Sequence, residues 1–151
     1  MKTIILTILV CVAMILSLTG CETNKNEFNV GSKSPIEIKE KGVTLSVKEN
    51  TLTKKGATLI LKNGSNVDVQ YGDSYKIEIK KDGEWHEINV ELNFNSPAYV
   101  LKSNKSEEIK IKWENDYGKL ASGNYRIIKD IYVETADETF ETFYVSAEFA
   151  I

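Results

Sequence analysis

The chain has 151 residues and a formal net charge of −3, with 42% hydrophobic and 27% charged residues. This composition excludes disorder throughout, because such a chain can bury a core. Arg126 is the only arginine, and a mildly acidic chain without clustered Lys and Arg is a poor nucleic-acid binder, so no nucleic-acid partner is expected. The length predicts one domain once any targeting segment is set aside.

The N-terminus has the pattern of a lipoprotein signal peptide. Lys2 precedes an apolar run, Ile4 to Leu18, which is shorter than the roughly 20 residues of a membrane-spanning helix. Leu18-Thr19-Gly20-Cys21 resembles the lipobox, in which small residues precede a cysteine that receives diacylglycerol. We predict cleavage after residue 20 and a lipid anchor on Cys21 that holds the protein at the extracytoplasmic face of the cell membrane. The alternatives are an ordinary secretory signal with a chance cysteine and an uncleaved anchor.

Residues 21–34 are polar and without a period, which predicts a lipidated cysteine followed by a flexible tether. Pro35 marks the expected start of the folded domain, residues 35–151. Cys11 lies in the predicted signal peptide and Cys21 takes lipid, so no pair remains for a structural disulfide.

Apolar and polar residues alternate in several short segments after Pro35, which predicts strands with one solvated face. The expected inward residues are Val43, Leu45, Val47; Ala57, Leu59, Leu61; Tyr75, Ile77, Ile79; Ile88, Val90, Leu92, Phe94; Ile109, Ile111, Trp113; and Phe143, Val145, Ala147, Phe149, Ile151. No segment has a sustained helical period.

Turn residues separate these segments. Asn63–Asn66 and Lys81–Glu84, the second with Asp-Gly at its centre, are interpreted as hairpin connections. Short alternating strands at this spacing predict an all-β, antiparallel two-sheet sandwich of about seven to eight strands.

Leu120 to Tyr125 matches a tyrosine corner, the motif of Greek-key sandwiches in which a strand tyrosine hydroxyl bonds back to the preceding corner. Leu120 would fill the core, Gly123 would permit the bend and Tyr125 would close it. The alternative is an ordinary strand tyrosine.

From about Gly42 to Ile151 the chain resembles a family of bacterial immunoglobulin-like domains that is common in lipoproteins and membrane-anchored proteins of Firmicutes. The residues that carry the resemblance are Gly42–Leu45, Gly56–Leu59, Tyr71-Gly72, Tyr75, Trp85, Trp113, Tyr117-Gly118, Leu120, Gly123–Lys129 and Ala147–Phe149. Asn104–Glu107 departs from the usual Pro-Gly-Glu, which affects only a turn. The resemblance implies an Ig-like sandwich and implies no catalytic residue; any step from it to function is analogy at the level of fold.

A catalytic or metal site is not expected. His86 is the only histidine, and no nucleophile–base set, phosphate loop or zinc-ligand cluster accompanies it. Glu134, Asp137, Glu138 and Glu141 lack the pattern of a calcium loop and are interpreted as a solvated hairpin. We therefore predict no enzyme activity and no cofactor.

Aromatic side chains are the remaining candidates for binding, because Tyr and Trp carry much of the energy at interfaces. Trp85, Tyr99 and Tyr117 lie near predicted loops and are the candidate partner-binding residues, whereas Trp113 and Tyr75 fall on inward positions. The predicted function is a membrane-anchored, non-enzymatic binding or accessory module of the cell envelope, with a protein or an envelope polymer as partner. The alternative is a sensor or modulator that acts on a partner membrane protein or an envelope-active compound.

Overall fold

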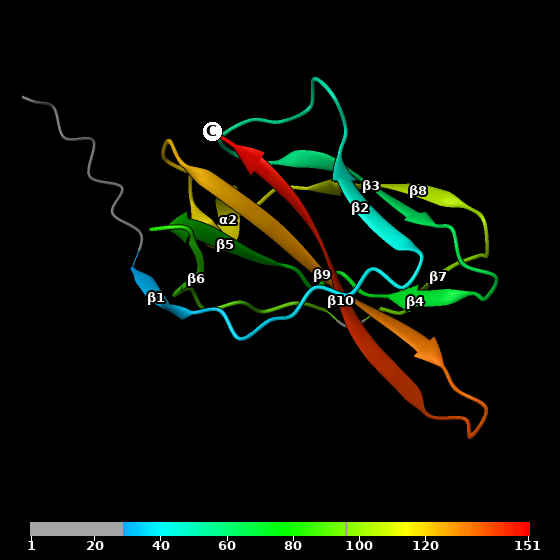
Figure 1. Ribbon diagram of the computed structural model, residues 1–151. Helices are drawn as coiled ribbons and strands as arrows, with labels where there is room; N and C mark the ends of the chain where they lie inside the picture. The colour runs from blue at the N-terminus through cyan, green and yellow to red at the C-terminus, as the bar shows by residue number, and fades with distance from the viewer. Residues whose placement is uncertain (1–28, 96) are drawn as a thin grey trace, which may run out of the picture.

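The computed structural model describes residues 29–95 and 97–151, which form two antiparallel sheets and a single helical turn (Figure 1). In chain order the elements are β1 (Val30–Lys33), β2 (Val43–Val47), β3 (Ala57–Asn63), β4 (Val69–Tyr71), β5 (Lys76–Lys81), β6 (Glu84–Ile88), β7 (Tyr99–Leu101), β8 (Ser106–Ile111), α2 (Glu114–Tyr117), β9 (Asn124–Glu134) and β10 (Phe140–Ala150). The predicted all-β sandwich is confirmed, with ten strands in this part of the chain rather than seven to eight.

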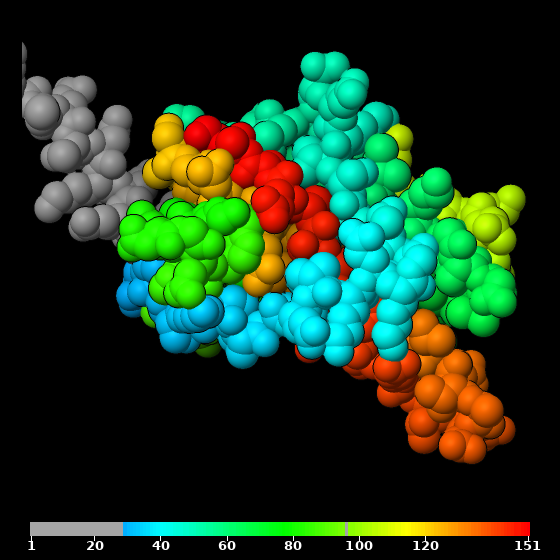
Figure 2. Space-filling model, in the orientation of Figure 1, coloured from blue at the N-terminus to red at the C-terminus, as the bar shows by residue number. Residues whose placement is uncertain are grey.

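β9 is the central strand of the larger sheet, whose order is β1-β6-β5-β9-β4-β7. β10 pairs with one edge of β9 along its whole length, while β5 and β4 share the other edge. The smaller sheet has the order β2-β3-β8. The long β9–β10 hairpin extends beyond the body of the sandwich at the end that carries β4 and β7 (Figures 1 and 2).

The core lies between the sheets and is built largely from the alternating residues that the sequence indicates. Val43, Leu59 and Val145 are fully buried, as the period-two pattern requires. Trp113 is also fully buried; its ring stacks on Phe149 with centroids 5.3 Å apart, and its indole N–H donates to the carbonyl of Lys54 at 3.0 Å. Trp113 therefore ties the start of the helical turn to both the core and the β2–β3 connection.

The tyrosine corner is present. The Tyr125 hydroxyl donates to the carbonyl of Ala121 at 2.9 Å, and both Tyr125 and Leu120 are buried. A Cβ at Gly123 would lie 3.2 Å from the Tyr125 ring, so the bend passes close to the tyrosine. The leucine, glycine and tyrosine thus have the roles that their spacing indicates.

We expect Tyr125→Phe to lower the free energy of unfolding by about 1–3 kcal/mol, because it leaves a part-buried carbonyl without its donor. Urea denaturation followed by tryptophan fluorescence measures the change. Tyr144→Phe, which removes the hydroxyl of a half-buried tyrosine on the neighbouring strand, serves as the control. Equal midpoints for Tyr125→Phe and the wild type would contradict a stabilising corner.

Two predicted hairpin connections have different outcomes. At Lys81–Glu84 the prediction is confirmed: β5 and β6 pair around Asp82 and Gly83, both with positive φ, as mirror-image turns require. At Asn63–Asn66 it is wrong, because β3 and β4 belong to different sheets. There the buried Asn63 amide donates to the carbonyls of Val67 and Leu101, at 2.8 and 3.1 Å, and fixes the crossover.

The strand predicted from Ile88 to Phe94 ends at Ile88. Val90, Leu92 and Phe94 pack partly buried against the core, but the chain around them makes no ladder. Their alternation therefore reports burial of every second side chain on a connecting segment, not pairing. This segment leads from β6 to β7 (Figure 1).

The N-terminal residues of the described chain correct the predicted tether. Val30–Lys33 forms β1, which pairs with β6, and Ile38 forms a bridge with Tyr144 of β10. Because β6 and β10 lie on opposite sides of β5 and β9, the intervening residues cross the outer face of the larger sheet, away from β2-β3-β8. The space-filling view shows this segment lying against the body (Figure 2). We call residues 34–40 the strap; folded structure thus begins before Pro35.

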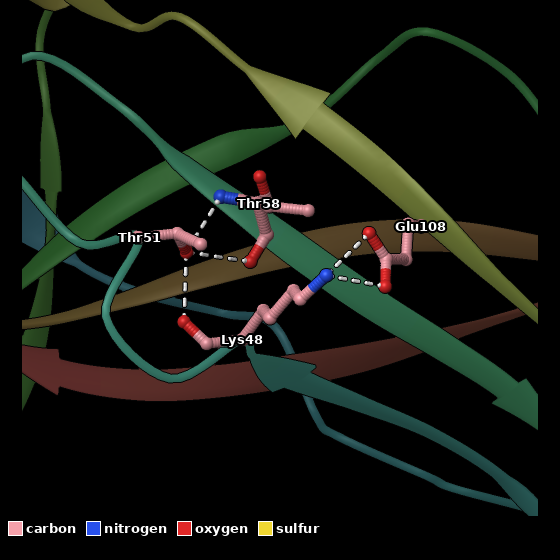
Figure 3. A network of polar contacts seen from close by, with 4 residues as sticks. All are labelled: Lys48, Thr51, Thr58 and Glu108. Atoms are coloured by element: carbon pink, nitrogen blue, oxygen red, sulfur yellow. Dashed lines mark hydrogen bonds and ion pairs between the residues drawn. The ribbon is translucent and has the colours of Figure 1, made fainter.

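Figure 3 shows polar contacts at the β2–β3 connection and between this connection and β8. The Thr51 hydroxyl donates to the carbonyl of Lys48 at 2.7 Å and accepts from the backbone N–H of Thr58 at 3.1 Å. The Lys48 ammonium reaches both carboxylate oxygens of Glu108, at 2.7 and 2.9 Å. An exposed ion pair of this kind contributes about 0–1 kcal/mol, so it shapes the surface more than it stabilises the fold.

Candidate ligand-binding face

The outer face of the larger sheet is divided into a covered half and an open half. Under the strap, Arg126 and Glu78 are cross-strand neighbours with 7% and 1% of their surface exposed. The Arg126 Nε donates to Glu78 at 2.6 Å, and Ser34 of the strap donates to the other Glu78 oxygen at 2.5 Å. This buried pair holds the strap on the sheet, although the inward positions of Ile77 and Ile79 predict that Glu78 lies on a solvated face.

Trp85 lies beside this pair and is half-buried. The Arg126 guanidinium lies 4.9 Å, and the Lys80 ammonium 5.1 Å, from the centre of its ring, distances at which cations are attracted to aromatic faces. The backbone carbonyl of Trp85 accepts a hydrogen bond from the Ser34 N–H at 2.8 Å. Trp85 is thus engaged by its own chain and fastens β6 to the strap, so its ring is a poor platform for a partner.

The open half of the outer face lies over β7, β4, β9 and β10. Val100, Gln70, Tyr132 and Thr142 are register partners on these successive strands, so their side chains share one face. Phe140, two residues before Thr142, belongs to the same face. Half of the surface of Val100 (50%) and of Phe140 (51%) is exposed. We call these five residues the distal face, because β4, β7 and the β9–β10 hairpin lie at the end of the molecule away from β1 (Figure 1).

An open pocket of about 460 Å³ adjoins the distal face. The β4–β5 loop contributes Gly72, Asp73 and Ser74, and Tyr132 and Phe140 come from the hairpin strands. The remaining lining residues are Gln70, Tyr71, Phe94, Asn95, Pro97, Ala98 and Thr142. An apolar pocket with a few convergent polar groups is the usual form of a ligand site.

Asp130 organises the hydroxyl groups at this pocket. Its Oδ2 accepts from the Ser74 hydroxyl and from the Tyr132 hydroxyl, each at 2.8 Å. The hydrogen bond to Asp130 raises the pKa of Tyr132 to about 12, with burial as the second cause. Both hydroxyl protons are therefore directed to Asp130 and held there at neutral pH.

Lys129 supports the same loop from the core side. Its side chain is fully buried, its ammonium donates to the carbonyls of Gly72 and Ser74 at 2.7 Å each, and it lies 5.6 Å from the centre of the Tyr71 ring. Burial lowers the pKa of Lys129 to about 8. A buried cation without a carboxylate in hydrogen-bonding contact is costly, and here it fixes the backbone that carries Asp73.

The structure places the predicted binding residues apart. Tyr99 is 42% exposed on β7, with its ring 5.3 Å from that of Tyr71; a hydrogen bond to Asp73 raises its pKa. Tyr117 corrects our expectation of a surface residue: it is 5% exposed, and its hydroxyl accepts from the Ile77 N–H at 2.9 Å. Its position next to Gly118 suggested a loop, but Tyr117 is the last residue of α2, and this turn directs the ring into the core.

Cys21 lies outside the described residues. Within residues 29–95 and 97–151, no helix is long and apolar enough to cross a membrane. The same residues contain no group of three or more His, Cys, Asp and Glu side chains that could hold a metal ion. His86 is half-buried, with its Nδ1 3.3 Å from the carbonyl of Gly31, and acts as a contact between β6 and β1.

The family model described as "Bacterial Ig-like domain" matches residues 39–150, which is most of the chain. The chain belongs to this bacterial Ig-like domain family. No curated protein sequence matches it. Among solved structures, the ASH/PapD-like domain of human CEP192 (PapD-like domain 7) is 15% identical, covers 80% of this chain and 93% of its own, and superposes with a TM-score of 0.33. That likeness is too distant to add to the assignment of this Ig-like domain.

Sequence reasoning missed Tyr132, Phe140 and Val100 of the distal face. Phe140 carried a usable signal: the inward residues of β10 are odd-numbered from Phe143 onward, so an even-numbered phenylalanine must point outward. The pocket itself had no local signal, because Asp73, Phe94 and Tyr132 come from three separate segments that only the fold brings together.

Proposed function

We propose that this protein is a lipid-anchored envelope lipoprotein whose Ig-like domain is a non-enzymatic binding module that engages its partner through the distal face. One observation carries the assignment of the face: Val100 and Phe140, each half exposed, flank a pocket on the half of the sheet that the strap leaves open. Exposed apolar side chains grouped at a concavity are typical of interaction sites.

The anchor and the distal face are suited to each other. The lipobox-like sequence puts lipid on Cys21, and the described chain enters the fold at β1, at the opposite end of the molecule from β4, β7 and the β9–β10 hairpin (Figure 1). A domain attached at one end would present the other end away from the bilayer. Two or more acyl chains already provide a stable membrane attachment, so the domain's own surface is free for a partner.

We predict that Cys21→Ser abolishes lipid attachment. Cells fed an alkyne-bearing fatty acid should label the wild-type protein and leave the variant unlabelled, because the thiol is the predicted acceptor. Cys11→Ser is the matched control and should label normally if cleavage removes residue 11. Equal labelling of wild type and Cys21→Ser would contradict the anchor.

Purification of the tagged protein from intact membranes tests the binding role. A partner retained by the wild type should be lost with Phe140→Ser, since removal of an interface hot spot costs at least about 2 kcal/mol, or roughly 30-fold in affinity. Lys110→Ser, on the smaller sheet, and His86→Ala should both retain the partner. Loss with Lys110→Ser but not with Phe140→Ser would place the interface elsewhere. Loss with His86→Ala in a folded, anchored protein would reopen an enzyme or metal site.

A further inference from the structure

Three groups at the pocket act as hydrogen-bond acceptors, namely the hydroxyls of Ser74 and Tyr132 and the carboxylate of Asp73, while the amides of Gln70 and Asn95 can also donate. The hydroxyls of Ser74 and Tyr132 both donate to Asp130, so each oxygen has only lone pairs left for a ligand. Asp73 is an exposed carboxylate that accepts a hydrogen bond from the Tyr99 hydroxyl and has further lone pairs to offer. A ligand that fits these groups has to supply the protons of the hydrogen bonds.

The buried ammonium of Lys129 does not reverse this preference for a ligand that donates hydrogen bonds. Two of the three N–H donors of Lys129 are used by the carbonyls of Gly72 and Ser74, and its ammonium lies over the ring of Tyr71. The single positive charge of Lys129 offsets the negative charge of one of the two carboxylates, Asp73 and Asp130, and leaves the charge of the other uncompensated. The pocket's surroundings therefore keep a negative charge. The neighbouring hairpin turn adds the exposed carboxylates of Asp137 and Glu138.

Aromatic rings form much of the remaining lining, namely Phe94, Tyr132 and Phe140. Ring faces attract ammonium and guanidinium groups, and carboxylates bind guanidinium with charge-assisted hydrogen bonds. Val100 and Phe140 extend the apolar surface beyond the pocket, and β7 is the last strand on its side of the sheet path. The site therefore offers a place for a charged side chain and also for apolar neighbours on the same chain.

We propose that the pocket takes a lysine or arginine side chain presented by a peptide segment that also carries apolar residues. This inference rests on the proposed role of the distal face and adds the chemistry of the partner to it. Charge complementarity decides between peptide classes, since an acidic segment would face Asp73 and the acidic hairpin turn. A glycan, which both donates and accepts, would leave its acceptors without donors at Ser74 and Tyr132.

The test uses the full-length protein purified with its lipid in an uncharged detergent, with affinity followed by thermophoresis. The probes are a capped Gly-Leu-Arg-Leu-Gly peptide, the same peptide with uncharged citrulline in place of arginine, and a tetramer of N-acetylglucosamine. We expect the arginine peptide to bind at least about tenfold more tightly than either other probe. Asp73→Asn should weaken its binding about tenfold, while Asp137→Asn, which removes the same charge from the hairpin turn, should change it less than about twofold.

Equal affinity for the arginine and citrulline peptides, tighter binding of the glycan, no binding of any probe, or equal effects of Asp73→Asn and Asp137→Asn would each overturn the inference. These failures are distinguishable from failure of the proposed function. A partner still lost from membranes with Phe140→Ser would keep the distal face as the binding surface and reject only the cationic ligand. A partner indifferent to Phe140→Ser would reject the face itself.

Discussion

Replacement of Arg126 by Met is expected to lower the free energy of unfolding by about 3–5 kcal/mol. The substitution leaves Glu78, which is 1% exposed, as a buried charge that keeps the hydrogen bond from the Ser34 hydroxyl but loses its cation. It also removes the guanidinium from the face of Trp85. Urea denaturation followed by tryptophan fluorescence gives the change, and the strap should lose protection from hydrogen exchange before the core does, because its attachment depends on this pair.

Two companion variants separate the buried pair from general effects of charge removal. Lys48→Met deletes the cation of an exposed ion pair with Glu108 and should cost less than about 1 kcal/mol. The double variant Arg126→Met with Glu78→Leu should recover much of the loss, since a buried ion pair replaced by apolar residues is often neutral or stabilising. Similar costs for Arg126→Met and Lys48→Met would show that the buried pair does not hold the strap.

The free energy of unfolding should rise by about 1–3 kcal/mol between pH 8 and pH 10 because of Lys129. Burial lowers the pKa of this ammonium from 10.5 to about 8. In that interval the unfolded chain therefore binds more protons at Lys129 than the folded protein does, and stability increases with pH wherever this holds. Chemical denaturation at a series of pH values measures the slope.

Tyrosine ionisation gives the opposite trend above about pH 10. Burial raises the pKa of Tyr117 to about 12, and the hydrogen bond to Asp130 raises that of Tyr132 to about 12. The unfolded chain then loses protons that the folded protein retains, so stability falls. Lys129→Met should keep this fall and lack the earlier rise. A wild-type curve without the rise, or a Lys129→Met curve parallel to it, would contradict a depressed pKa at Lys129.

The strands of the sandwich were predictable because their side chains alternate between a core and a solvated face. Val43, Leu59, Ile77 and Val145 are inward in the structure as the period of two requires. The tyrosine corner was predictable for a similar reason, since all of its parts lie within six residues, Leu120 to Tyr125. Local patterns of this kind need no knowledge of which strands pair.

The errors occurred where pairing or burial depends on distant residues. Nothing in Val30–Lys33 distinguishes an edge strand from a polar tether, because β6 supplies both its ladder and its register. Arg126 lies on the outer face of β9 and is buried because the strap covers it. Lys129 has the inward parity of Ile131, and its buried ammonium is held by carbonyls of the β4–β5 loop, which the local sequence does not reveal. For Tyr117, proximity to a glycine suggested a loop, whereas the helical turn directs the ring inward.

The same reasoning explains why the candidate site was only partly predictable. Tyr99 could be chosen from sequence because exposed aromatics favour interfaces. The acceptor character of the pocket, in contrast, arises from Asp130 taking the protons of Ser74 and Tyr132, residues 56 and 2 positions away in the chain. Such an arrangement is a property of the folded sheet and leaves no trace in a linear pattern.

The central claim is that the distal face contacts the partner, and site-specific photocrosslinking in living cells tests it most directly. A benzoylphenylalanine would replace either Phe140, on the distal face, or Lys110, on the smaller sheet. We predict a discrete crosslinked product with the probe at Phe140 and none at Lys110, provided that the protein is anchored. Products at Lys110 alone, or the same products at both positions, would contradict the account.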